Sequence, residues 1–209
     1  MRVRPVTPQR LAGELAERID GFGVGARPRI AIDGAPAARP GDLADALVEL
    51  VRLGGRPAVR VAASDFLRPA SLRLERGRTD PDAFYDDWLD TGGLTREVLA
   101  PLATGGTGRI LPTLWNAATD RASRAAYTHL PPGGVLLVSG ALLLGRGLPF
   151  DLTVHLALSP GALRRGTPPE WAWTLPAYAR YDDEVDPARL ADIVIRADDP
   201  DHPAVVDTR

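Results

Sequence analysis

Apolar residues in the first part of the chain recur at the spacing that is typical of an amphipathic helix. Leu11, Leu15 and Ile19 follow one another every four residues and predict a first helix, which ends at a glycine-rich stretch. Thr7 is suited to cap this helix, and Pro8 fits its first position. The pattern therefore predicts that a helix opens the fold.

The next segments predict a strand, a loop, a helix and a second strand. Arg29 to Asp33 reads as a short buried strand, and a loop of glycine, proline and alanine runs from Gly34 to Gly41. Leucines and valines at helical spacing follow Asp42, which we expect to cap that helix, and Ala58 to Ala63 predicts the second strand. This order is a βαβ unit, which implies parallel strands.

Later segments extend the same alternation. Thr95 to Leu102 predicts a helix, and three more strands are expected at Val135 to Val138, Leu152 to Leu158 and Asp192 to Arg196. The sequence therefore predicts an α/β fold with a mainly parallel central sheet and flanking helices.

Two irregular regions lie between these elements. The charged and aromatic stretch from Arg68 to Leu94 is expected to cover the carboxyl edge of the sheet, where open α/β sheets hold their ligands. A stretch rich in arginine, proline and tryptophan, at about 160–181, is expected to form a lid. We expect one domain over residues 1–209, with residues 1–28 as an N-terminal helix and linker.

Composition narrows the chemistry. The formal net charge is −2, so we expect no nucleic-acid partner and no attraction to anionic membranes. The most apolar stretch, Val135 to Leu144, is interrupted by Ser139 and Gly140 and is too short to cross a bilayer, and the first residues lack the apolar core of a signal peptide. Cysteine is absent, which excludes thiolate chemistry and favours a cytoplasmic location. All 25 basic residues are arginine, so no lysine ammonium is present.

Several motifs, in order along the chain, resemble those of uridine-kinase-like P-loop nucleoside kinases. Ile30-Ala31-Ile32-Asp33-Gly34 precedes the loop, and Ser64-Asp65-Phe66-Leu67-Arg68-Pro69 is similar to the Asp-Asp-Phe-His-Arg-Pro of those relatives. The similarity continues through Arg76-Gly77-Arg78, Asp80-Pro81, Phe84-Tyr85, residues 135–140, Tyr178 to Pro187 and Ala191 to Ile195. It implies a three-layer P-loop NTPase-like fold, and it implies ATP and Mg²⁺ as cofactors wherever phosphotransfer is active.

The resemblance places the phosphate loop of the family on nine residues: Gly34, Ala35, Pro36, Ala37, Ala38, Arg39, Pro40, Gly41 and Asp42. A working loop reads G-x-x-x-x-G-K-[ST], in which backbone N–H groups and the lysine hold phosphates and the hydroxyl binds Mg²⁺. Here Arg39 brings a Cβ where glycine allows a tight turn, and Gly41 has no hydroxyl. Pro40 has neither ammonium nor N–H, and it disfavours the α region for Arg39. The sequence thus predicts a degenerate loop whose ring of N–H groups is broken.

Two other positions of the family's catalytic set are changed or ambiguous. Ser139 stands where the resemblance implies an acid that helps to hold Mg²⁺. The family's catalytic base aligns by spacing with Ser64, although the adjacent Asp65 is also suited to the role. Loss of one preorganised electrostatic group typically lowers a rate by about 10²–10³. We therefore expect strongly impaired phosphotransfer.

The substrate side retains more candidates. Phe66, Arg68, Tyr85 and Trp115, together with Asp65, are candidates to line a cleft for a nucleoside. The alternative is core or lid packing for the three aromatic residues and a surface ion pair for Arg68.

Arginine supplies the remaining candidates for phosphate contacts. The resemblance places Arg164 and Arg165 where relatives carry lid arginines, and Arg39 is a candidate to contact phosphate from a shifted position. The alternative for Arg164 and Arg165 is a solvated surface. His129, His155 and His202 show no metal-ligand spacing, and the acidic run at 182–186 reads as a solvated face, so we expect no metal site there.

Three functions remain open at this point. The first is a binding or regulatory module for a nucleoside, a nucleotide or a protein partner, with phosphotransfer lost. The second is an active ATP-dependent kinase that uses Arg39 and Asp65 in an unorthodox loop. The third is a protein-interaction scaffold, and a homo-oligomer is compatible with each.

Overall fold

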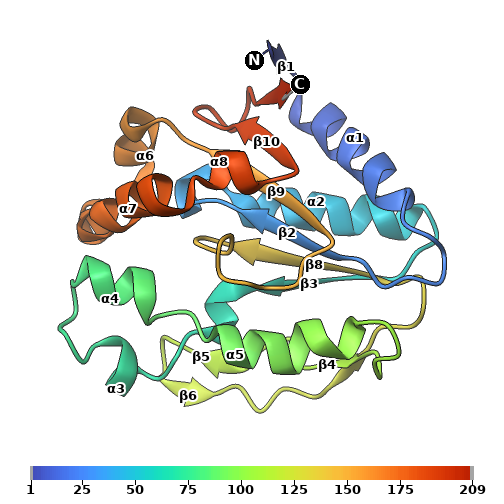
Figure 1. The fold of residues 1–209 in the computed structure, drawn as a ribbon, viewed down its shortest axis with the longest axis horizontal. Helices are drawn as coiled ribbons and strands as arrows, with labels where there is room; N and C mark the ends of the chain where they lie inside the picture. Colours follow the sequence, from blue (N-terminus) through green and yellow to red (C-terminus); the bar gives the residue numbers. More distant parts are fainter. Residues whose placement is uncertain (1, 208–209) are drawn as a thin grey trace.

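Seven strands form the central sheet of the computed structural model, which describes residues 2–207 (Figure 1). Their spatial order is β1-β11-β10-β9-β2-β8-β3. The strands are β1 (Arg2–Pro5), β2 (Arg29–Asp33), β3 (Ala58–Ala62), β8 (Val135–Gly140), β9 (Leu152–Ala157), β10 (Ile193–Arg196) and β11 (Ala204–Asp207). The five strands from β10 to β3 are mutually parallel, which confirms the predicted α/β fold with a mainly parallel sheet.

One face of the sheet is covered by α1 (Pro8–Asp20) and α2 (Pro40–Leu53). Leu11, Leu15 and Ile19 of α1 pack into the core on this face, as their spacing predicts. The predicted cap is also confirmed, because the Thr7 side chain accepts a hydrogen bond from the Arg10 N–H over 3.3 Å.

Helix α2 begins three residues earlier than predicted. Its first residue is Pro40, which suits the first helical position because its ring fixes φ and its nitrogen has no hydrogen to leave unpaired. Asp42 therefore lies in the first turn, and the cap position falls on Arg39, which offers no side-chain hydrogen bond.

The opposite face is covered by shorter helices (Figure 1). They are α3 (Ala70–Arg73), α4 (Pro81–Asp86), α5 (Thr91–Leu94), α7 (Leu175–Val185) and α8 (Pro187–Leu190). A π-helical turn (Thr95–Leu99) and a 3-10 turn (Ala100–Leu102) continue α5, so the helix predicted near 95–102 is present in distorted form. Two small antiparallel pairs lie beside them: β4 (Arg109–Ile110) with β7 (Thr128–His129), and β5 (Trp115–Asn116) with β6 (Arg121–Ala122).

The predicted lid region is helical. After β9, the chain forms α6 (Pro160–Gly166), a 3-10 helix η5 (Pro169–Thr174) and then α7. Arg180 of α7 forms ion pairs with Asp82 and Asp86 of α4 at 3.2 and 3.1 Å, which links the lid region to the helix facing it.

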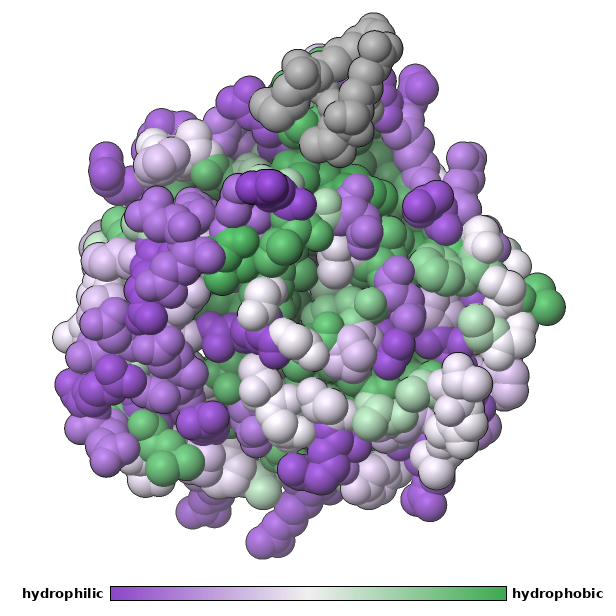
Figure 2. Space-filling view, viewed as in Figure 1, coloured by the Kyte–Doolittle hydropathy of each residue, from purple (hydrophilic) through white to green (hydrophobic). Residues whose placement is uncertain are grey.

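The edge formed by β1 and β11 was not predicted. Strand β11 runs antiparallel to β10, and β1 runs antiparallel to β11, so the two ends of the described chain pair with each other. Hydrophilic side chains cover much of the rim of the molecule, and hydrophobic residues are visible in the middle of the face shown in Figure 2. Among residues 2–207, no helix combines the length and the apolarity that crossing a bilayer would require.

Candidate functional site

A cavity of about 600 Å³ opens at the carboxyl ends of β2, β8 and β3, the sheet edge at which the sequence analysis expected a ligand. The β-strand ends contribute Gly34, Ser139, Ala62 and Ser64. The phosphate-loop region and the lid provide the other walls. Seven of the nine loop residues line this cavity: Gly34, Pro36, Ala37, Arg39, Pro40, Gly41 and Asp42.

The loop is closed by a short 3-10 turn over Pro36–Ala38. The Ala38 N–H donates to the Ala35 carbonyl at 2.8 Å, and the Arg39 N–H donates to the Pro36 carbonyl at 3.0 Å. Amides that a phosphate loop would direct at its ligand are thus used within the turn itself.

Other amides of the loop are occupied or lack a hydrogen. The Gly34 N–H donates to the Gly140 carbonyl at 3.0 Å, and the Asp42 N–H donates to the Arg39 carbonyl at 3.1 Å. Pro36 and Pro40 have no N–H. Within residues 34–42, only Ala35, Ala37 and Gly41 keep an N–H without an acceptor in the described chain, and these three are not consecutive.

Arg39 adopts the left-handed conformation, with φ 53° and ψ 52°. The sequence analysis expected Pro40 to exclude Arg39 from the right-handed α region, and the chain satisfies that restriction in a region that glycine enters freely. For a residue with a Cβ, this conformation costs about 1–2 kcal/mol. The Arg39 side chain is more than half exposed, and its nearest acid is Asp201 at 3.7 Å.

An arginine that the sequence analysis did not single out lies beside this loop. Arg60 of β3 donates from Nε to the Ser139 hydroxyl at 2.9 Å and from Nη1 to Asp45 at 2.8 Å. Its Nη2 lies so close to Gly41 that a Cβ at that position would sit 3.0 Å from it. The guanidinium thus fills the space between the two positions where the resemblance implies metal-binding groups.

These residues do not fit Mg²⁺. Gly41 has no hydroxyl, Ser139 has no carboxylate, and a guanidinium stands between them where a cation would have to bind. Among the described residues, no group of three or more His, Asp or Glu side chains is arranged to hold a metal ion.

The two candidates for the base differ in position. Ser64 lines the 600 Å³ cavity, whereas the Asp65 side chain is outside that lining. Burial raises the pKa of Asp65, and the positive charge of Arg60 opposes that rise. Of the two candidates for the family's base position, Ser64 therefore lines the cavity and Asp65 lies next to it in the chain.

The predicted substrate residues are distributed around the cavity rather than in its walls. Phe66 is fully buried in the core, and Tyr85 is 8% exposed between Tyr181 and the guanidinium of Arg180, which lies 4.3 Å above its ring. Trp115 lies on the β5–β6 hairpin, where its indole N–H donates to Asp120 at 3.1 Å.

The predicted arginine contacts lie farther out. Arg68 lies in the segment after β3, where its carbonyl accepts a hydrogen bond from Arg73. Arg164 and Arg165 are exposed on α6, and the neighbouring Gly166 and Thr167 line the cavity in their place.

Aromatic residues that the sequence analysis did not assign to the site line part of this cavity. They are Phe84 of α4, Trp88 from the segment that follows α4, and Trp171 of η5. Trp88 lies 6.3 Å from Trp171 and 5.5 Å from Trp173, and Phe84 lies 5.7 Å from Trp173. The lid turn is therefore held against the α4 region by ring contacts.

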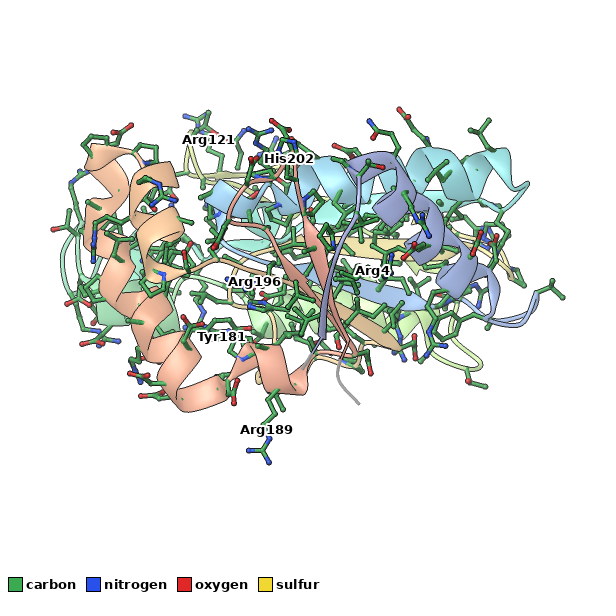
Figure 3. All side chains as sticks on the ribbon, turned by 90° about the horizontal axis from the view of Figure 1, so that it is seen from above. Arg4, Arg121, Tyr181, Arg189, Arg196 and His202 are labelled. Atoms are coloured by element: carbon green, nitrogen blue, oxygen red, sulfur yellow. The ribbon has the colours of Figure 1, made fainter. Side chains whose placement is uncertain are left out.

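A second cavity, of about 240 Å³, lies under α7 and α8 and shares Gly34 and Tyr178 with the first. Asp33 is fully buried beside it and accepts hydrogen bonds from the Leu143 N–H at 2.9 Å, His155 Nδ1 at 2.7 Å and the Tyr181 hydroxyl at 3.2 Å. Tyr181 lies on the inner side of α7, while Arg189 of α8 points away from the molecule (Figure 3).

His155 of β9 is buried in the interior of the sheet, where it pairs with Asp33. Asp182 and Asp186 of the acidic run also line the second cavity. Burial raises the pKa of Asp182, and His155 opposes that rise.

A scan of protein-family models finds none that matches this sequence, and a search of curated proteins finds no significant match either. Solved structures do match. A possible uridine kinase from Bacillus stearothermophilus is 18% identical over 89% of this chain and 97% of that one, with a TM-score of 0.72. A candidate fructose transport system kinase from Silicibacter sp. TM1040 is 23% identical over 88% and 91% of the two chains, with a TM-score of 0.62. The chain therefore has the fold of uridine-kinase-like P-loop kinases.

Proposed function

We propose that this chain is a uridine-kinase-like protein in which ATP phosphotransfer is lost or strongly impaired, and which acts as a nucleoside- or nucleotide-binding module. The observation that carries the proposal is the state of the phosphate loop. Most of its amides bond within the loop or to β8, and Pro40 replaces the lysine.

Electrostatics explain why this loop matters. Phosphoryl transfer depends almost wholly on positioning and on stabilisation of charge by the loop, the lysine and the metal. In this chain the lysine is absent, the hydroxyl position is Gly41 and the acid position is Ser139. Each change removes a different contact to the triphosphate or to its Mg²⁺. All of these contacts would stabilise charge on the same few phosphate oxygens.

The cavity supports the binding half of the proposal. Its volume of about 600 Å³ lies in the range of small-molecule sites, and its walls combine aromatic rings with a few polar groups. A nucleoside has the matching combination of a planar base and a polar sugar.

Two further parts of the proposal concern the whole chain. We propose that the protein is located in the cytoplasm and that its chain forms one domain.

The alternative is a working kinase that uses Arg39 and Asp65. The raised pKa of Asp65 favours it, because a carboxyl whose pKa is shifted by burial is a common feature of catalytic bases. A protein-interaction scaffold is the third possibility, and it requires that no small molecule binds.

Thermal unfolding with different ligands separates these functions. A ligand at a hundred times its Kd stabilises a fold by about 2.7 kcal/mol, which for a chain of this size raises the Tm by roughly 5–10 °C. We expect uridine or cytidine to raise the Tm and Mg²⁺–ATP to leave it unchanged.

The other outcomes are equally informative. A clear shift with Mg²⁺–ATP, together with transfer of labelled phosphate to a nucleoside by the purified protein, would establish the kinase. No shift with any nucleoside or nucleotide would favour the scaffold and end the proposal.

A further inference from the structure

We infer that the 600 Å³ cavity contains an oxyanion site that works without a metal and is built on Arg60. Its ligand is the phosphate of a phosphomonoester whose other part is a planar ring, such as a nucleoside monophosphate. This inference rests on the proposed function and specifies the ligand and the residue that selects it.

The Arg60 guanidinium is held in one orientation by two neighbours. Nε donates to the Ser139 hydroxyl at 2.9 Å, and Nη1 donates to both carboxylate oxygens of Asp45, at 2.8 and 3.0 Å. Nη2 has no hydrogen-bond partner among the residues that the structure describes. The remaining donor, Nη2, is therefore fixed in place.

Gly41 supplies a second donor at the same place. Its N–H is one of the three loop amides without an acceptor in residues 2–207, and Nη2 of Arg60 lies close to its Cα. A side chain at this position would push against the guanidinium, because its Cβ would lie 3.0 Å from Nη2. The absence of a side chain thus lets the guanidinium lie close to the loop backbone, and in the proposed site one oxyanion accepts hydrogen bonds from both Nη2 and the Gly41 N–H.

The charges near this site favour an anion over a metal ion. Arg39 and Arg60 line the cavity, with Asp42 as the one acid in its lining, and Asp45 pairs with the Nη1 edge of Arg60 from outside. A divalent cation would be repelled by the guanidinium and would find no carboxylate at Ser139. The one nitrogen of this guanidinium that is left unpaired, Nη2, carries two N–H groups and a share of the positive charge, so it can donate a charge-assisted hydrogen bond to a phosphate oxygen.

The aromatic part of the cavity lining suits a ring. Phe84, Trp88 and Trp171 are among the lining residues, so a planar group beside them would contact aromatic faces or edges. A ligand with a phosphate near Gly41 and a ring near these residues would use both parts of the lining, and a free inorganic anion would use only one.

The test is calorimetric titration of the full chain with uridine 5′-monophosphate and with uridine, each in EDTA and in MgCl₂. We expect the monophosphate to bind at least tenfold more tightly than uridine, and we expect EDTA to leave its affinity unchanged. Arg60→Met should remove the tenfold advantage, whereas Asp45→Asn should strengthen binding several-fold, because it removes the carboxylate charge that offsets Arg60 while its amide oxygen still accepts from Nη1.

The matched control is Arg52→Met. Arg52 lies on the same helix as Asp45 and donates to the Ala58 carbonyl, away from the cavity lining. This variant should bind the monophosphate as the wild type does, and the Tm of each variant shows that it is folded.

Three results would overturn the inference. If Arg60→Met binds the monophosphate as well as the wild type does, or if binding needs Mg²⁺, the metal-free site is wrong while the proposed function stands. If neither uridine nor its monophosphate binds the wild type under any condition, the proposed function fails with it.

Discussion

The buried side chain of Asp33 holds three separate segments of the chain together. It is the last residue of the central strand β2, and it joins the segment after β8, the strand β9 and the helix α7 through three hydrogen bonds. The next residue, Gly34, begins the phosphate loop. The position of that loop relative to the lid therefore depends on a carboxyl group that lies outside the lining of the large cavity.

Replacing this carboxyl is expected to be severe. Asp33→Ala would leave the Leu143 N–H, the His155 ring and the Tyr181 hydroxyl without their acceptor, and each unpaired buried group costs about 1–3 kcal/mol. We expect a loss of about 3 kcal/mol or more in the free energy of unfolding, measured by urea denaturation.

Asp33→Asn is the matched control for this loss. The amide keeps the size and one acceptor oxygen, and its NH₂ can donate to the imidazole nitrogen. We expect it to lose clearly less than the alanine variant. Equal stability of the alanine variant and the wild type would show that Asp33 does not organise this region.

Arg39 makes a related point about local conformation. Its positive φ is the conformation for which glycine is suited, and the proline that follows leaves few alternatives. The loop therefore takes a backbone path that suits glycine, at a position that carries an arginine.

Helix α1 is attached to the edge strand β1 through one acidic side chain. Glu14 accepts hydrogen bonds from Arg4 at 2.6 and 3.0 Å and from Arg10 at 2.9 Å. These hydrogen bonds lower the pKa of Glu14 from 4.5 to about 2, and the bond from Arg4 has the largest effect. The contact therefore persists to acidic pH.

This lowered pKa predicts the pH dependence of Glu14→Gln. Since the folded protein binds the proton less readily than the unfolded chain, the stabilisation by Glu14 is complete above about pH 4.5 and is lost as the pH falls towards about 2. The carboxylate is a third exposed, so we expect the variant to be less stable at pH 7 by under about 1 kcal/mol.

The measurement is the difference in Tm between wild type and Glu14→Gln at several pH values. It should narrow as the pH falls from about 4.5 to about 2, and a molar concentration of salt should reduce it at neutral pH. A difference that stays constant with pH would contradict the assignment.

Aromatic contacts hold the lid turn η5 against the α4 region. Trp173 touches Phe84, Trp88 and Trp171, with ring centroids between 5.5 and 5.9 Å apart. Contacts of this kind contribute about 0.5–1.5 kcal/mol each beyond the area they bury. The turn should therefore open when they are removed.

Trp173→Ala is expected to speed hydrogen exchange in the amides of residues 170–174 by about tenfold or more, as followed by mass spectrometry. Trp115→Ala is the control, because Trp115 lies on the β5–β6 hairpin and bonds to Asp120. It should leave exchange in η5 as it is in the wild type. Unchanged exchange in Trp173→Ala would show that the rings do not hold the lid.

Across the whole molecule, the parallel strands could be predicted because each is a compact run of branched apolar residues. The strand β1 could not, since its residues Arg2–Pro5 include a single apolar aliphatic side chain and its partner β11 lies at the other end of the described chain. Only the folded sheet brings these two segments together.

The site, too, could be predicted only in part. Arg39, Pro40 and Gly41 could be recognised as departures from the phosphate-loop motif because they are consecutive in the sequence. Arg60 could not be recognised, because it is one of 25 arginines in the chain and lies within a predicted strand, and its contact with Gly41 exists only after β3 and α2 pack together. Trp171 was hidden for a similar reason, since its role depends on α4 facing the lid.

Because three distant segments define this site, restoring one of them should not restore nucleotide binding. The variant Arg39→Gly/Pro40→Lys/Gly41→Thr rebuilds the loop motif, yet the new threonine would press on the Arg60 guanidinium, because a Cβ at position 41 would lie 3.0 Å from Nη2. We expect no rise in Tm with Mg²⁺–ATP for this variant.

Adding Arg60→Val and Ser139→Asp removes that guanidinium and places a carboxylate near the end of β8. A valine suits a strand position, and the loss of the arginine leaves room for a cation beside the threonine hydroxyl. We expect the variant with all five substitutions to gain a rise in Tm of several degrees with Mg²⁺–ATP, and to lose it in EDTA. If the loop variant alone shows the full shift, the obstacle to triphosphate binding lies within residues 39–41, and Arg60 has no part in it.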